Sequence, residues 1–260
     1  MEALRKKIEQ MTAPYTGNWG ILVKNINTGE SLSIEPDRVF PSASMIKLPI
    51  MFEVMRQAAA GALSLDDTLL VTAAARVGGA GILHELRPGI AMTIRELVTL
   101  MIIISDNTAT NLLIDLVGME AVNRTSTNLG LCSTFLRRHM MDFAAAKAGN
   151  ENETTAADMA LMLEAVYQGR GLPQGYADIM LGILKRQQVR DKLPFYLPEE
   201  FEIANKTGTL HGVEHDAGIL YFPDGPYIVC VLTGNLTANY EGIQLAAGIG
   251  KAIYEHLVGM

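Results

Sequence analysis

The chain is poor in several features that mark specialised classes of protein. It has 2 cysteines and 1 tryptophan among 260 residues. Two cysteines are too few for a disulfide scaffold, and Cys230 falls in an apolar run, so we expect a buried free thiol there. No apolar run approaches the roughly 20 residues that a membrane-spanning helix needs, so we expect no membrane span. A basic excess is also missing. The net charge is -7, which argues against nucleic-acid binding because phosphate contacts need a clustered basic face.

The composition that remains is that of a globular protein. Hydrophobic residues make up 49% of the chain, and 260 residues are enough for one domain or two closely packed ones. Residues 1–8 are typical of a charged amphipathic helix and not of an export signal. The sequence therefore fits a cytoplasmic protein, or an exported one whose signal was removed.

The predicted elements run from strands to helices and back to strands. Residues 19–26 and 31–34 are typical of a hairpin, and residues 42–185 are predicted to be helical. Residues 223–226, Pro-Asp-Gly-Pro, indicate a turn between two later strands. The remaining predicted elements are strands at 201–206, 217–222 and 227–233 and a helix at 240–257.

This order predicts a mixed α/β fold of the α+β kind. We expect an antiparallel five-stranded sheet flanked by terminal helices, with an all-α domain inserted into it. Residues 1–38 and 200–260 would form the sheet domain, and residues 39–199 the helical domain. Because sites tend to lie between such units, we expect the active site in the cleft between the two domains.

Ser44 and Lys47 form the first of three short motifs that carry chemistry. They lie three residues apart in a helix expected to run from Ser44 to about Ala60, so their side chains share one face. A serine at a helix N-terminus suits a nucleophile, because free N–H groups there favour negative charge. The alternative is a capping serine and a surface lysine. The apolar residues 48–52 argue for a buried helix, where a lysine is costly unless it is paired.

The second motif, Ser105-Asp106-Asn107, separates two apolar helices. A capping box at residues 93–96 opens the first of these helices. A plain helix–helix turn is one interpretation, because these residue types favour turns. In the functional interpretation, Ser105 is a proton shuttle near the lysines of the first and third motifs, and Asn107 holds the substrate amide.

The third motif, Lys206-Thr207-Gly208, is predicted to end an edge-like strand at residues 202–209. Its lysine would point into the cleft, and Gly208 permits a ligand to approach the backbone closely. The backbone N–H groups of Thr209 and Ser44 would form an oxyanion hole. The alternative is a solvated lysine beside a turn glycine.

The ordered trio S-x-x-K, S-D-N and K-T-G is the signature of class A β-lactamases and penicillin-binding proteins, and the chain resembles this family over nearly its whole length. Residues 93–97, 105–113 and 154–160 also resemble the family's sequence closely. The resemblance implies the fold described above.

The resemblance also implies a role for each motif residue. Ser44 would be the nucleophile, Lys47 its base and Ser105 the shuttle. The implied substrate contacts are Asn107 for the amide, and Lys206, Thr207 and Thr209 for the carboxylate and the oxyanion.

The loop before Thr154 departs from the class A pattern. In class A β-lactamases this omega loop carries Arg-x-Glu-x-x-x-Asn before a Thr-Thr pair, and Arg138 matches its arginine. Met140 then falls at the position of the deacylating Glu, and Ala144 at the position of its Asn partner. Neither residue can activate a water. The arginine that helps to hold the substrate carboxylate also has no match, and His215 is nearest in register.

The chain therefore resembles D-alanyl-D-alanine peptidase-like relatives of class A. We expect a serine acyl-enzyme hydrolase that is acylated by β-lactams, deacylates slowly and acts on D-Ala-D-Ala-like peptides or esters. One alternative is a true class A-type β-lactamase in which another group, such as Asp142, replaces the base. A second alternative is a penicillin-binding receptor without catalysis, for which the chain offers no signalling domain.

We expect no metal and no cofactor. His211 and His215 are four residues apart, but a glycine lies between them and the stretch is predicted to lie between strands. The glycine-rich residues 78–81 lack the Gly-Lys-Ser/Thr that completes a phosphate loop. The expected partner is a small-molecule or peptide substrate, with no nucleic acid.

Overall fold

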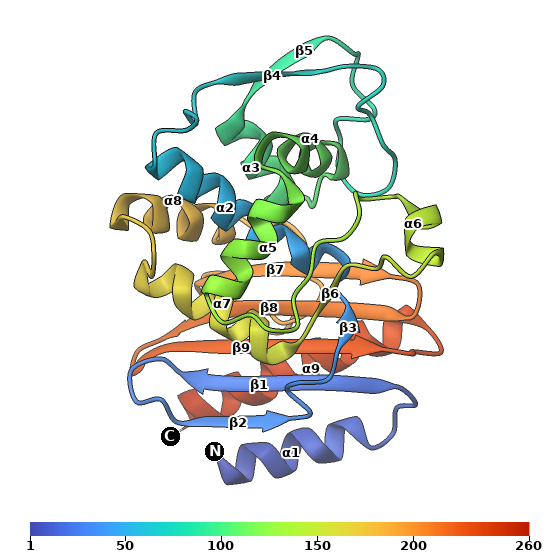
Figure 1. Cartoon of the computed structure of the whole chain (residues 1–260). Helices are drawn as coiled ribbons and strands as arrows, with labels where there is room; N and C mark the ends of the chain where they lie inside the picture. Colours follow the sequence, from blue (N-terminus) through green and yellow to red (C-terminus); the bar gives the residue numbers. More distant parts are fainter. Residues whose placement is uncertain (260) are drawn as a thin grey trace.

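The computed structural model describes residues 1–259 as a sheet with helices on both faces (Figure 1). The helices are α1 (Glu2–Thr12), η1 (Ala43–Ile46, a 3-10 helix), α2 (Lys47–Ala59), α3 (Ile94–Ile103), α4 (Asn107–Val117), α5 (Met119–Asn128), α6 (Phe143–Lys147), α7 (Ala156–Gln168), α8 (Gln174–Leu184) and α9 (Asn239–Val258). The strands are β1 (Asn18–Asn25), β2 (Ser31–Ile34), β3 (Phe40–Pro41), β4 (Thr68–Val71), β5 (Ile90–Thr93), β6 (Glu153–Thr154), β7 (Ile203–Leu210), β8 (Val213–Phe222) and β9 (Gly225–Gly234).

The main sheet has 5 strands in the order β2-β1-β9-β8-β7, and every neighbouring pair is antiparallel. The predicted mixed fold is confirmed, and so is the turn between β8 and β9. The third motif falls near the end of β7, which continues to Leu210, one residue beyond the strand predicted at 202–209. Strand β8 also begins at Val213, ahead of the predicted residue 217. Strand β7 forms the edge of the sheet, where one side of its backbone is free to face a substrate.

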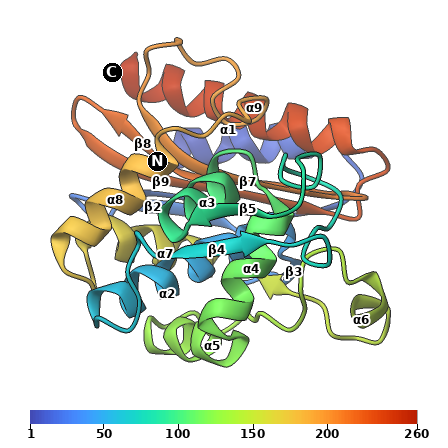
Figure 2. The ribbon, with the colours of Figure 1, turned by 90° about the horizontal axis from the view of Figure 1, so that it is seen from above.

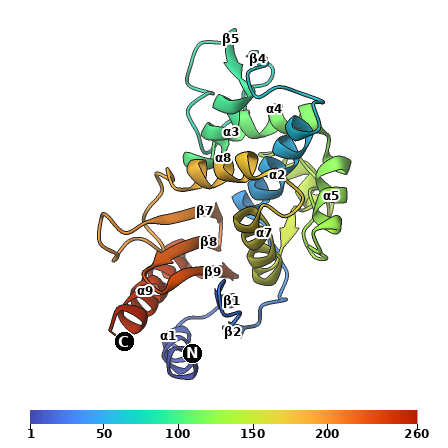
Figure 3. The same cartoon turned by 90° about the vertical axis from the view of Figure 1, so that its left-hand side faces the viewer.

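Two hydrophobic cores lie on opposite faces of the sheet. Helices α1 and α9 cover one face through residues such as Ile8 and Ile253, and α7 lies on the other face (Figure 3). The second core is continuous from sheet residues such as Ile219 into helices α2 to α8. One core therefore joins the sheet to the helical segment. The division into a sheet domain (residues 1–38 and 200–260) and a helical domain (residues 39–199) stays a proposal.

The helical segment contains a hairpin that the sequence interpretation missed. Strands β4 and β5 pair as a separate antiparallel hairpin over α3 and α4 (Figure 2). Each strand has only four residues, and a long loop separates them, so no alternation was visible in the sequence. The predicted capping box is present, because the Thr93 side chain accepts from Glu96 N and the Glu96 side chain accepts from Thr93 N.

Two further predictions concern Cys230 and membrane-spanning helices. Cys230 is a buried free thiol, and burial raises its pKa above the usual range. Within residues 1–259, no helix combines the length and the apolar character needed to cross a membrane.

Candidate active site

The three motifs meet at the hydroxyl of Ser105. Lys47 Nζ donates to Ser105 Oγ at 3.0 Å, and Lys206 Nζ donates to the same oxygen at 3.1 Å. Ser105 itself adopts a φ of 58°, an uncommon conformation for a residue with a side chain. Such strained residues often cluster at active sites, and the turn between α3 and α4 holds this one beside both lysines.

Ser44 lies in the 3-10 turn η1, which leads directly into α2, and its side chain is half-buried. The expected helix therefore exists, with a tighter first turn. The preceding backbone is firmly held: Ser42 N donates to Asn152 O at 2.7 Å, and His215 Nε2 bonds the carbonyl of Pro41 at 2.8 Å. Ala43 has a φ of 46°, so Ser44 follows a second strained residue.

Lys47 is fully buried and bonds to residues of the second motif. Its ammonium donates to the carbonyl oxygen of Ser105 at 2.7 Å and to Asn107 Oδ1 at 2.9 Å. Within residues 1–259 it makes no hydrogen bond to the Ser44 hydroxyl. Burial and the nearby charge of Lys206 hold the Lys47 pKa well below its usual value, although Asp106 opposes this effect. A neutral Lys47 amine could accept a proton during acylation.

Lys206 is the second buried cation of the site. Besides Ser105 Oγ, it donates to the carbonyl of Thr207 at 2.7 Å. Burial, followed by the charge of Lys192, lowers the pKa of Lys206 to about 7. Near neutral pH, this group is therefore partly cationic and partly neutral.

Asn107 lines the pocket beside Ser44, but both ends of its amide already have partners. Its Oδ1 accepts from Lys47, and its Nδ2 donates to the carbonyl of Gly78 at 3.1 Å. Asn107 N donates to Ala80 O at 3.0 Å. The glycine-rich segment 78–81 thus covers the second motif.

Asp106 has a structural role. Its Oδ2 accepts from the backbone N–H groups of Ile82 and Leu83 at 2.7 and 2.9 Å, and its Oδ1 caps α4 at Ala109 N. One carboxylate therefore fixes the cover segment and begins the helix that carries Asn107.

Gly208 permits a close approach within the protein itself, and the predicted approach of a ligand stays a prediction. A Cβ at this position would lie 3.1 Å from both Ala43 Cβ and Ser44 N. The glycine thus admits the turn that carries Ser44 against β7. Thr209 lines the same pocket as Ser44, whereas Thr207 is buried opposite Asp216 in the sheet.

Met140 lies where the omega-loop alignment predicts, in the pocket beside Ser44, and only 7% of it is exposed. Ala144 does not reach the pocket. It is exposed on the short helix α6, which Asp142 caps through Ala145 N. Asp142 is exposed as well and does not line the pocket, so it is poorly placed to replace the missing base.

The pocket around Ser44 is small, about 150 Å³. Its walls are mainly apolar or backbone, and the residues that line it within the described chain include no carboxylate. They are Ala43, Ser44, Gly79, Ala80, Asn107, Arg138, Met140, Met141, Phe143, Thr209 and Leu210. The one cation among them, Arg138, is buried and bonded to Glu151 at 2.7 Å. The described lining residues therefore combine a serine hydroxyl with no carboxylate that could act as a general base.

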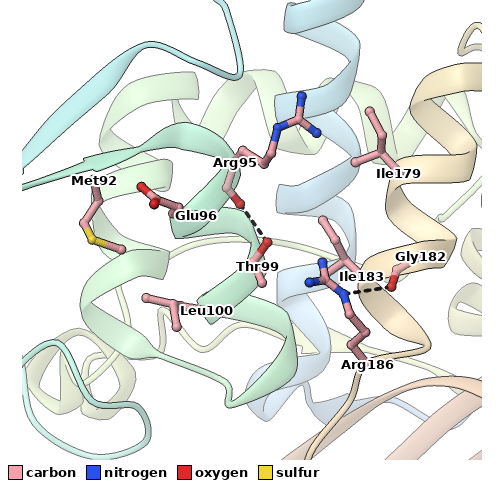
Figure 4. Close-up of a pocket in the computed structure, with 9 residues that line it drawn as sticks. All are labelled: Met92, Arg95, Glu96, Thr99, Leu100, Ile179, Gly182, Ile183 and Arg186. Atoms are coloured by element: carbon pink, nitrogen blue, oxygen red, sulfur yellow. Dashed lines mark hydrogen bonds between the residues drawn. The ribbon is translucent and has the colours of Figure 1, made fainter.

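A larger pocket of about 580 Å³ lies between α3 and α8 (Figure 4). It contains no residue of the three motifs. Its Glu96 is occupied by the capping box, and its Arg186 donates to Gly182 O at 3.1 Å. Size alone therefore does not mark the reactive site.

Several buried polar residues near the site were missed because they were read as loop. His215 and Asp216 lie inside β8, and Lys192 precedes β7. His215 is fully buried and does not line the pocket beside Ser44, and burial lowers its pKa to about 4. His211 is exposed in the turn before β8. The density of polar residues in 211–216 was the signal that could have revealed a buried network.

The five-stranded fold and the convergence of a serine with two buried lysines define a serine-type hydrolase of the β-lactamase-like class. The chain belongs to the β-lactamase enzyme family, whose sequence model matches residues 3–257. The family expected from the motifs is thereby confirmed.

Known proteins of similar sequence and structure agree with this assignment. A β-lactamase from Sphaerobacter thermophilus is 34% identical with a TM-score of 0.90, covering 100% of this chain and 98% of that one. A Leu-to-Glu mutant of PBP-A, in an acyl-enzyme complex with penicillin G, is 28% identical with a TM-score of 0.91, again covering 100% and 98%. A β-lactamase of Rhodobacter capsulatus is 34% identical over 65% of this chain, and this match spans only 58% of that protein.

Proposed function

We propose that this protein is a serine acyl-enzyme hydrolase. β-Lactams acylate it at Ser44, and the resulting acyl-enzyme is hydrolysed slowly. The proposal rests on one observation. The buried lysines Lys47 and Lys206 bond to Ser105, next to the pocket beside Ser44, but the described residues that line this pocket include no carboxylate. Acylation and deacylation make different demands, and this site meets only the first.

In the proposed acylation step, the Ser44 oxygen attacks the carbonyl of the substrate. Its proton passes towards neutral Lys47, with Ser105 relaying a proton to the departing nitrogen. Two fixed acceptors, Ser105 O and Asn107 Oδ1, take the two N–H bonds of a neutral Lys47. Its lone pair is then left for a hydroxyl. The N–H groups of Ser44 and Thr209 would hold the oxyanion, and Lys206 and Thr207 the substrate carboxylate.

Deacylation is the step that the site supports poorly. A water beside the ester must lose a proton, and Met140 presents a thioether where a base is needed. A ring-opened β-lactam keeps its leaving nitrogen tethered beside the ester, whereas a peptide or ester substrate releases its leaving group and makes room for water. We therefore propose D-Ala-D-Ala-like peptides or esters as the substrates that turn over.

A true β-lactamase is the second candidate, favoured by the 34% identical relatives that carry that name. The two candidates predict different turnover of a penicillin, but both require Ser44. The experiment that tests the shared part is labelling with a fluorescent penicillin. Wild-type protein should be labelled covalently and Ser44→Ala should not. Labelling of Ser44→Ala at another residue, or no labelling of either protein, would refute the proposal.

The substrate class is tested separately with an N-acylated D-Ala-D-Ala peptide and its D-lactate ester. Release of D-alanine or D-lactate by wild-type protein, and none by Ser44→Ala, is the expected result. Hydrolysis of penicillin with multiple turnovers, and no release from either peptide or ester, would favour the β-lactamase instead.

A further inference from the structure

A buried ion pair lies directly behind the third motif. Lys192 Nζ is 2.6 Å from Glu214 Oε2, and the two side chains are 1% and 2% exposed. Lys192 belongs to the segment that joins α8 to β7, and Glu214 lies on β8 opposite Thr209. Apolar residues of similar volume are often as stabilising as a buried ion pair, so stability alone gives little reason for this pair.

The pair is connected to β7 at the residues next to the nucleophile. Lys192 Nζ donates to the carbonyl of Gly208 at 3.1 Å and to Thr209 Oγ1 at 3.1 Å. It also donates to His215 O at 3.2 Å. Glu214 Oε2 accepts from Thr209 Oγ1 at 2.8 Å, and Asn239 Nδ2 donates to Glu214 Oε1 at 2.7 Å. Every group of the pair is therefore bonded, and three of the contacts fall on residues 208–209.

These contacts fix the peptide unit between Gly208 and Thr209. A trans peptide is planar, so its C=O and N–H point in opposite directions. Because the Gly208 carbonyl is directed at Lys192, the N–H of Thr209 is directed away from it. A cation on a carbonyl oxygen also polarises the amide, which makes its N–H a stronger donor.

The Thr209 hydroxyl is fixed by the same pair. An ammonium can only donate and a carboxylate can only accept, so this hydroxyl accepts from Lys192 and gives its proton to Glu214. It has no proton left for a substrate carboxylate. This assigns that contact to Lys206 and Thr207, and leaves Thr209 with its backbone N–H.

We propose that Lys192 and Glu214 are positioning residues of the oxyanion site. They aim and polarise the Thr209 N–H from behind the strand without touching the substrate. This inference rests on the proposed function, because it assumes that an oxyanion forms at Ser44. The buried positive charge of Lys192 also agrees with the lowered pKa of Lys206.

The test compares Lys192→Met, the double variant Lys192→Met/Glu214→Gln and the control Lys185→Met. Lys185 pairs with Glu202 at 2.9 Å, but both partners are partly exposed, so the control removes one lysine from a surface pair. The single variant leaves a buried carboxylate unpaired and is expected to melt at a lower temperature. The double variant removes both charges and is expected to regain much of that loss.

Two readouts separate positioning from stability. We expect the double variant to be acylated by penicillin about 10²-fold more slowly, the lower range for loss of an oxyanion donor. The ester C=O stretch of its acyl-enzyme should move to higher wavenumber, because the carbonyl is less polarised. Lys185→Met should match wild type in both. A double variant with the wild-type acylation rate and the wild-type stretch would overturn the inference.

Hydrogen exchange on the free protein keeps the inference testable by itself. If wild type is not acylated by penicillin, the proposed function fails, but exchange at residues 205–210 still reports how firmly the segment is held. Faster exchange there in the double variant than in Lys185→Met supports positioning. Equal exchange in the two variants contradicts it.

Discussion

Asn111 holds the main chain of Met140 from both sides. Met140 N donates to Asn111 Oδ1 at 2.8 Å, and Asn111 Nδ2 donates to Met140 O at 3.1 Å. Asn111 lies on α4, one helical turn beyond Asn107, so the same helix carries the second motif and fixes the omega loop. The side chain of residue 140 is thereby kept in the pocket whatever its chemistry, because the clamp uses only backbone atoms of Met140.

The first prediction follows from this clamp. Met140→Glu should keep the loop in place and supply the missing base, which is typically worth about 10²–10⁴-fold. The lifetime of the penicilloyl-enzyme should fall by that order while the acylation rate stays close to wild type. Met140→Gln, of similar shape but without basicity, is the matched control. Because Ala144 is exposed on α6, adding Ala144→Asn should change little. An unchanged lifetime in Met140→Glu would show that the loop does not limit deacylation.

Lys47→Arg should slow acylation by about 10²–10⁴-fold, because arginine stays charged and cannot act as a base. The buried surroundings that lower the Lys47 pKa cannot neutralise a guanidinium. The measurement is the rate of penicillin labelling, with the melting temperature as a control for folding. A folded variant that is labelled at the wild-type rate would assign the base to another group.

The pKa of Lys206, lowered to about 7, gives a pH dependence with a defined sign. Lys206 is cationic below pH 7 and neutral above it, so it attracts a penicillin carboxylate most strongly at acid pH. The apparent affinity for penicillin should weaken between about pH 6 and pH 8. The affinity for a neutral ester substrate should not weaken over this pH range. In Lys206→Gln, the affinity for penicillin should not weaken over it either. Parallel pH profiles for the two substrates would contradict the assignment.

Gly208→Ala should slow acylation with only a small effect on the melting temperature. The added methyl would lie 3.1 Å from Ser44 N and must displace the nucleophile's turn by tenths of an ångström. A misplacement of about 1 Å can cost about 10²-fold, so we expect a loss of up to that size. Gly182→Ala is the control, because nothing lies within 4 Å of its added methyl. Equal acylation by the two variants would show that the contact is not critical.

The sequence predicted the sheet and the three motifs because these depend on local patterns. The capping box at Thr93 and the strands around Gly225 follow from residue types within a few positions. Ser105 and its lysines could be paired only because their motifs resemble a known family, since the contacts join residues far apart in the chain.

The rest could not be predicted, because it depends on packing. Glu214 and Asp216 read as loop, yet both are buried in β8 by partners from other segments, Lys192 and Asn205. Met140 lines the pocket beside Ser44, but spacing in the omega loop could not show that α6 turns Ala144 to the surface. Counting residues along the chain gives the aligned position of a residue, but it does not give the direction of its side chain.

The central claim is that acylation is supported and deacylation is not. Intact mass spectrometry during incubation with a small excess of penicillin measures both steps at once, with Ser44→Ala as the blank. We predict that wild-type protein gains the mass of one penicillin and keeps it for minutes or longer, while free penicillin is not consumed beyond one equivalent. Rapid return to the unmodified mass, with several equivalents of penicillin hydrolysed, would contradict the account and make the protein a β-lactamase with a base outside the residues named here.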